Sequence, residues 1–144
     1  MGTTEVKIDH FIAQKKIAML WLIVSFVLFL IFLILSLTKY KEVDSQIWNW
    51  FLPNIIPTLS LILGVFVSEF FNSKKNRKQV VLFYFNLTFY MSLCYLMIFF
   101  VLIIVDGLDS NLPLTEIIAK SNLYLGPLQG LVTITMGLFF VKGN

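Results

Sequence analysis

Few residues in this sequence carry the groups that catalysis or metal binding needs. The chain has one cysteine, Cys94, and one histidine, His10, which excludes an intrachain disulfide, a Cys-x-x-Cys redox pair and a zinc cluster. It also has no phosphate-cradling glycine run and no residues arranged as a Ser–His or paired-Asp protease site. We therefore expect no enzyme activity, no cofactor and no metal site.

One ionisable residue falls within a long apolar stretch, and that residue is Glu69, near the end of residues 51–71. Ionisable groups inside membrane spans are costly and mark functional sites. If several copies form a ring, Glu69 from each copy makes an acidic collar that favours cations at a pore mouth. The alternative is that Glu69 reaches the membrane surface and pairs with Lys74, Lys75 or Arg77.

Uncharged polar residues within apolar stretches are the other candidates. Gln129 and Asn86 can line a wet path or bond to another helix, and bonding is the favoured interpretation for each. Between residues 79 and 105, polar side chains recur at nearly helical spacing and form a narrow stripe, namely Tyr84, Thr88, Ser92 and Tyr95. The candidate pore or gate residues are therefore Glu69, Gln129, Asn86, Thr88 and Ser92.

The composition indicates which elements position these side chains. Of the 144 residues, 58% are hydrophobic and 13% are charged, whereas soluble domains average about 45–50% apolar and about 25% charged residues. A span needs about 20 apolar residues. Four stretches meet this need, so we predict an all-α, polytopic membrane protein with one transmembrane domain and spans at about 17–38, 51–71, 79–105 and 122–141.

Basic residues predict the orientation. With four crossings, residues 1–16, the 72–78 connection and the C-terminal tail share one side and hold eight of the 11 Lys and Arg residues. The positive-inside rule places this side, and both termini, in the cytoplasm of a cell with the protein in its inner membrane. Residues 1–16 form a cytoplasmic or interfacial segment, with a possible interfacial helix at 3–16, and 113–120 is expected as a short helix on the outer surface.

Small residues predict where helices meet protein rather than lipid. Helices associate in bilayers through close approach of small residues and a few hydrogen bonds. The first span is almost wholly large and apolar, which favours contact with lipid. Two others carry candidate packing seams, Ser60, Gly64 and Ser68 in one and Gly126, Gly130, Thr133 and Gly137 in the other. Such seams usually pack against other helices of the same chain. A single four-helix bundle has little interior for so many small and polar helix faces, and this favours self-association.

Two prolines fall near the start of the second span. Pro53 and Pro57 each lack a backbone N–H, so the helix is expected to bend or unwind there. We expect Asn54 and Thr58 to satisfy the carbonyls that the prolines leave free.

A basic cluster of Lys74, Lys75, Arg77 and Lys78 lies in the short connection between the second and third spans. Its ordinary role is to fix the topology and contact anionic membrane lipid. The alternative is a site for a phosphate-rich ligand, such as a nucleotide or oligonucleotide messenger.

The chain resembles a known class of membrane protein in its overall layout. The features that carry the resemblance are four spans, inward termini, Thr58-Leu59-Ser60 at the entry to the second helix and the basic turn from Lys74 to Lys78. In this layout the chain resembles the small four-helix membrane pore proteins of bacterial and phage abortive-infection systems, such as the channel of the lambda Rex exclusion system. The resemblance implies an oligomeric inner-membrane pore that opens when a cytosolic partner or messenger reports infection, depolarises the cell and stops phage growth. It carries over no gating residue.

These observations lead to a homo-oligomeric, ion-conducting pore as the first hypothesis, with the third or second helix lining the path and Glu69 and Gln129 tuning it. The alternatives are a non-conducting accessory or assembly subunit of a larger membrane complex and a holin-like lysis protein. A transporter is less favoured, because the first span has no membrane-embedded carboxylate.

Overall fold

The computed structural model describes residues 7–71, 79–108 and 114–142, with the side chains of 69–71 and 141–142 left out of the description. Four long helices follow one another: α1 (His10–Thr38), α2 (Asp44–Phe71), α3 (Leu82–Leu108) and α4 (Leu114–Lys142). All four are long and apolar enough to cross a membrane. The all-α, four-span architecture predicted from the sequence is therefore confirmed.

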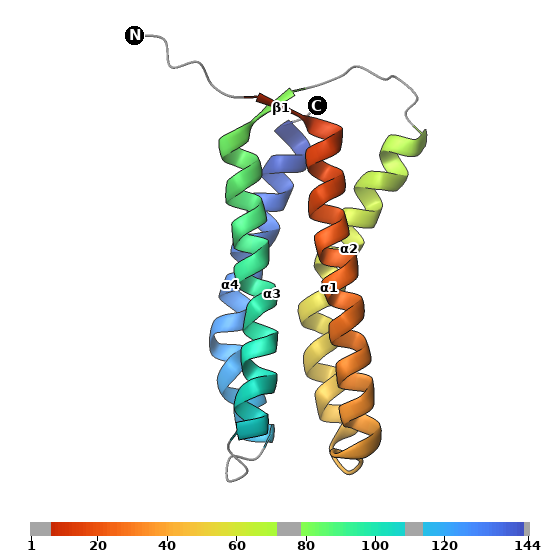
Figure 1. Ribbon diagram of the computed structural model, residues 1–144, viewed down its shortest axis with the longest axis vertical. Coiled ribbons are helices and arrows are strands. Elements are labelled where there is room, and N and C mark those ends of the chain that lie inside the picture. Colours follow the sequence, from red (N-terminus) through yellow and green to blue (C-terminus); the bar gives the residue numbers. More distant parts are fainter. Residues whose placement is uncertain (1–6, 72–78, 109–113, 143–144) are drawn as a thin grey trace.

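The helices form an elongated bundle with both chain ends at the same end, as Figure 1 shows. We call this the terminal end and the opposite one the far end. Helix α1 packs beside α2 and α3, and α4 packs beside α2 and α3, so that α1 and α3 run in parallel. The last turns of α2 diverge from the bundle (Figure 1), and none of its described side chains after Ile62 is buried.

A two-stranded sheet closes the terminal end. Strand β1 (Lys7–Asp9) pairs antiparallel with β2 (Gln79–Val81), and Lys7 lies opposite Val81. Val80 is buried beneath the sheet. The pairing ties the chain before α1 to the chain before α3, which holds these two parallel helices together at their starts.

Three helix boundaries differ from the sequence predictions, each for a local reason. In place of an interfacial helix at 3–16, α1 begins at His10, because the Asp9 carboxylate caps it by accepting the N–H groups of Phe11 and Ile12. Helix α3 begins after β2 and continues to Leu108, beyond the expected 79–105. The expected surface helix at 113–120 is the first part of α4.

Helix α2 also begins earlier than expected, at Asp44 rather than near residue 51. A carboxylate in the first turn suits the positive end of the helix dipole. The added turns are held by packing, since Ile47 and Trp50 are buried in the core. Asn49, which lies between them, is on the exposed side of the helix.

The outward faces of α1 and α3 are built from large apolar side chains, which suits contact with lipid. On α1 they include Ile23, Phe26 and Ile34, and on α3 they include Met97 and Val101, all at least half exposed. Lipid chains solvate such groups as well as protein does. The outward sides of α1 and α3 are therefore suited to lipid, whereas α2 and α4 expose large apolar side chains, such as Leu63 and Leu131, beside small and polar ones.

Candidate functional site

A wide, open groove of about 500 Å³ lies between the first half of α2 and the first half of α4. Carboxamide side chains dominate its wall, and none of its lining residues is charged. We call it the amide groove. Its lining residues are Gln46, Asn49, Trp50, Pro53, Asn54, Thr115, Ile118, Ala119, Asn122 and Gln129.

The floor of the amide groove is set by a proline. In a regular helix the N–H of residue 57 would donate to the carbonyl of residue 53, but Pro57 has no N–H. The Gln129 side chain of α4 replaces it: its Nε2 donates to the Pro53 carbonyl oxygen at 3.1 Å and lies 3.4 Å from the Asn54 carbonyl oxygen. Gln129 thus bonds another helix and also lines the groove.

Asn54 joins three helices at this level. The Tyr95 hydroxyl of α3 donates to the Asn54 carbonyl oxygen at 2.9 Å and lies 3.4 Å from its side-chain oxygen. The Asn54 amide donates to the Trp50 carbonyl at 2.7 Å. Neither proline frees that carbonyl, and the Thr58 hydroxyl is buried without a partner. The expectation that Asn54 and Thr58 satisfy the freed carbonyls is therefore wrong.

The outward residues of α2 and α4 continue the groove along the membrane span. On each helix one set of small and polar residues falls within about 60° of one line at 100° per residue, while others, such as Thr58 and Thr135, lie on other sides. We call the two stripes together the α2/α4 polar face. Its members are Gln46, Asn49, Pro53, Pro57, Ser60, Gly64 and Ser68 on α2, and Thr115, Ala119, Asn122, Gly126, Gln129, Gly130, Thr133 and Gly137 on α4.

The glycines of this face pack against nothing within the chain. Gly64, Gly126 and Gly130 are exposed, and Gly137 is partly exposed. A Cβ atom added at any of the four would meet no other atom within 4 Å. Ser60 and Ser68 are exposed and Thr133 is partly exposed. The two predicted seams thus lie on the surface of the bundle, available to another molecule.

The remaining candidates from the sequence are dispersed. Thr88 and Ser92 are buried in the core, where the Thr88 hydroxyl donates to the Tyr84 carbonyl at 2.9 Å and lies 3.3 Å from the Thr135 carbonyl. Asn86 is half-buried on α3. The Glu69 side chain and the basic cluster lie outside the described residues; the latter comprises Lys74, Lys75, Arg77 and Lys78.

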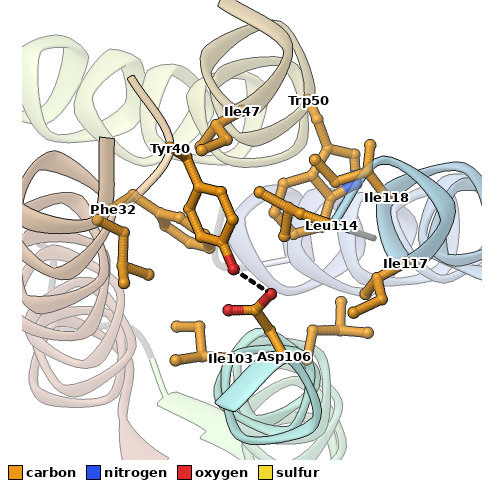
Figure 2. Close-up of a pocket in the computed structure, with 11 residues that line it drawn as sticks. Phe32, Tyr40, Ile47, Trp50, Ile103, Asp106, Leu114, Ile117 and Ile118 are labelled. Atoms are coloured by element: carbon orange, nitrogen blue, oxygen red, sulfur yellow. Dashed lines mark hydrogen bonds between the residues drawn. The ribbon is translucent and has the colours of Figure 1, made fainter. Parts of the chain in front are cut away.

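A buried carboxylate at the far end was missed by the sequence interpretation, which placed Asp106 in a loop. Asp106 is 7% exposed near the end of α3. The Lys39 ammonium lies 2.9 Å from one of its oxygens, and the Tyr40 hydroxyl donates to the other (Figure 2). Apolar side chains of α2 and α4 surround the cluster and a cavity of about 20 Å³, room for about one water.

This cluster changes the proton affinity of the two residues that follow α1. Hydrogen bonding with Tyr40, and then with Asp106, raises the pKa of the Lys39 ammonium above its ordinary 10.5. Burial, and then the hydrogen bond to Asp106, raises the pKa of the Tyr40 hydroxyl above its ordinary 10.0. The cluster therefore ties the α1–α2 turn to α3 throughout the neutral range.

Comparisons with known proteins return no relative: no family model, no curated protein and no solved structure matches the chain. Within the described ranges, no three His, Cys, Asp or Glu side chains come together as a metal-binding group. The interpretation of function therefore rests on the residues of the chain itself, above all on the α2/α4 polar face.

The Gln129 bond to the Pro53 carbonyl predicts a specific double-mutant result. Gln129→Leu should lower the free energy of unfolding in detergent by about 1–2 kcal/mol, because it strands a backbone acceptor. In a Pro57→Ala background the alanine N–H satisfies the same carbonyl, so Gln129→Leu should cost less than about 0.5 kcal/mol. Equal costs in both backgrounds would show that the carbonyl is not what Gln129 serves.

The far-end cluster predicts an alkaline transition. Since Lys39 and Tyr40 hold protons more tightly when folded, their contribution is complete below about pH 10 and is lost as the pH rises through the raised values. Tyr40→Phe should lower the free energy of unfolding by about 1–2 kcal/mol at neutral pH. This difference should shrink above about pH 10 in unfolding titrations. Tyr90→Phe, at an exposed tyrosine of α3, should change nothing.

Proposed function

We propose that this four-span membrane protein assembles from several identical copies through the α2/α4 polar face and conducts ions across the membrane. The observation that carries the proposal is this face itself. It combines exposed glycines that contact nothing in the chain with an amide-lined groove. The opposite faces of the bundle present large apolar side chains.

The physical argument begins with the cost of leaving the face to lipid. A carboxamide that meets hydrocarbon without a hydrogen-bond partner costs several kcal/mol on transfer scales. Gln46, Asn49 and Asn122 are all exposed in the single chain. Water, or polar groups of another copy, must therefore cover them in the membrane. Small residues nearby let a second helix approach closely, which is how helices associate without a hydrophobic driving force.

The groove favours conduction over simple association. It opens widely and is lined by amides that can exchange hydrogen bonds with passing water or ions. Copies related by symmetry around the α2/α4 polar face would bring several such grooves together at the far end. Helices α2 and α4 then line the path, so the second helix keeps the role expected from the sequence and α4 takes it in place of the third. Glu69, in the last turn of α2, stays a candidate for an acidic collar at the terminal end.

Two glycines of the face provide the test. Gly64→Leu and Gly130→Leu should each weaken self-association tenfold or more, equal to about 1.4 kcal/mol, and reduce the ion flux of reconstituted protein. Gly107→Leu is the matched control, because Gly107 also has open space around it but lies at the end of α3. The measurements are mass determination in native-like nanodiscs and conductance in planar bilayers, with and without cytosolic extract.

Two results would contradict the proposal. If the wild-type chain is a single copy in nanodiscs at every concentration, the polar face serves another purpose. If the chain is recovered only with a different membrane protein, it is an accessory or assembly subunit, the alternative that the sequence left open. Release of whole enzymes, rather than ions, from loaded vesicles would favour a holin-like protein.

We further propose that the pore acts in anti-phage defence, as the resemblance to abortive-infection proteins implies. A cytosolic partner or a nucleotide messenger would open it and depolarise the membrane. In cells that express the chain, infection should collapse the signal of a membrane-potential dye before lysis and lower the plaque count. The Gly64→Leu variant should lose both effects. An unchanged potential in infected cells would remove the defence role and leave the pore itself untouched.

A further inference from the structure

The interior of the bundle contains polar side chains that no partner satisfies. Within the described part of the chain, both polar atoms of the Gln14 side chain and the hydroxyls of Ser25, Thr58 and Ser92 are buried without a hydrogen bond. The Trp21 indole N–H is unpartnered as well. These five side chains are at most 4% exposed. Each buried polar group without a hydrogen bond costs about 1–3 kcal/mol. Their number in one small core therefore requires a reason.

Aromatic contact fixes how these groups align. The Trp21 ring of α1 stacks on the Tyr95 ring of α3 with centroids 5.9 Å apart. Since α1 and α3 run in parallel, residues two turns earlier on each helix, Gln14 and Thr88, lie at one level. Ser92 lies between Thr88 and Tyr95 on the inner face of α3, and all three are buried. Polar groups therefore recur at about one per turn toward the terminal end.

One end of this series reaches the terminal end of the bundle, and the other reaches the amide groove. At the terminal end the buried His10 ring lies one turn before Gln14, with its Nε2 at 3.1 Å from the Phe139 carbonyl oxygen. At the other, the Tyr95 hydroxyl bonds the Asn54 carbonyl, and Asn54 lines the amide groove. We call the series from His10 to Asn54 the buried polar track.

The track and the groove together match the thickness of a membrane. From His10 to Trp21, at the level of Tyr95, the rise is about 16 Å at 1.5 Å per residue. From Asn54 to Gln46, along the groove, it is about 12 Å. Their sum, about 28 Å, is close to the hydrocarbon thickness of about 30 Å. Polar groups thus cross the whole apolar region within one chain.

We propose that this buried polar track is a proton path, so that each chain conducts protons through its own core from the amide groove to His10. The inference rests on the proposed ion conduction but not on the assembly of copies, because this route runs within each chain rather than between copies. The track is buried, with side chains at most 8% exposed from His10 to Asn54, and it offers no passage for a hydrated metal ion. Single waters that bridge its orphaned groups suffice for protons.

The transfer conserves protons, but it reverses the direction of the hydrogen bonds along the waters, which must turn back before the next proton passes. Each bridging water accepts a proton on one side and releases another on the opposite side, while the hydroxyl and amide groups hold the waters in line by hydrogen bonds. The His10 imidazole closes the track at the terminal end, where its Nε2 donates to the Phe139 carbonyl oxygen.

The test is proton flux into vesicles that contain the purified full chain and a pH-sensitive dye, driven by a potassium gradient and valinomycin. Ser92→Ala and Gln14→Met remove orphaned groups with little change of volume, so both should fold, and each should lower proton flux tenfold or more. The matched control is Ser36→Ala. Ser36 is also buried, but its hydroxyl accepts from the Trp48 indole at 3.3 Å, away from the track.

The outcomes separate the two proposals. Proton flux that falls in both track variants and persists in Ser36→Ala supports the path. Proton flux unchanged in Ser92→Ala and Gln14→Met overturns it. Sodium or potassium currents as large as the proton current would also overturn it, while leaving an oligomeric pore in place. A wild-type chain that passes no ion, with or without cytosolic extract, overturns both.

Discussion

The structure depends on a constraint that lipid imposes on the backbone: every carbonyl in the apolar region needs a donor. Pro57 breaks this rule in α2, and a side chain from another helix repairs the break, since Gln129 of α4 serves the Pro53 carbonyl. Tyr95 of α3 bonds the neighbouring Asn54 carbonyl. These bonds tie three helices at one level and hold open the groove above them. A defect in one helix thus becomes the junction that positions α2, α3 and α4.

The bundle divides its surface by residue size as well as by polarity. Helices α1 and α3 show large apolar side chains outward, while α2 and α4 show both large apolar side chains, such as Leu63 and Leu131, and a stripe of small and polar ones. In a bilayer, lipid satisfies the large apolar side chains but not the stripe of small and polar residues. A monomer that used its glycines for internal packing would have them in contact. Here a Cβ atom at Gly64 or Gly130 would meet open space, so the face is left for something outside the chain.

The sequence was sufficient for the four spans and the stripes, because hydropathy and helical spacing depend on residue types alone. It was insufficient wherever the position or burial of a residue depends on which other residue it contacts in the folded chain. The start of α1 depends on the Asp9 cap, and the burial of Asp106 depends on Lys39 and Tyr40 arriving from another element. The partner of Gln129 depends on α2 and α4 being neighbours. Whether a small-residue stripe faces inward or outward is equally a property of the assembled bundle; extending the Ser60 stripe back to Asn49 could have suggested the groove.

Satisfied and unsatisfied polar groups are distributed unevenly along the bundle, and this distribution indicates where it can change. The far end holds the ion pair between the buried Asp106 and the half-exposed Lys39, and the middle holds the bonds of Gln129 and Tyr95. Toward the terminal end, α2 leaves the bundle after Ile62, and the buried amide of Gln14 and hydroxyl of Ser92 have no partner. Admitting water there breaks no bond of these side chains and relieves the cost of their burial. The far end is therefore the fixed part of the bundle, and the terminal half is the part that can rearrange at least cost.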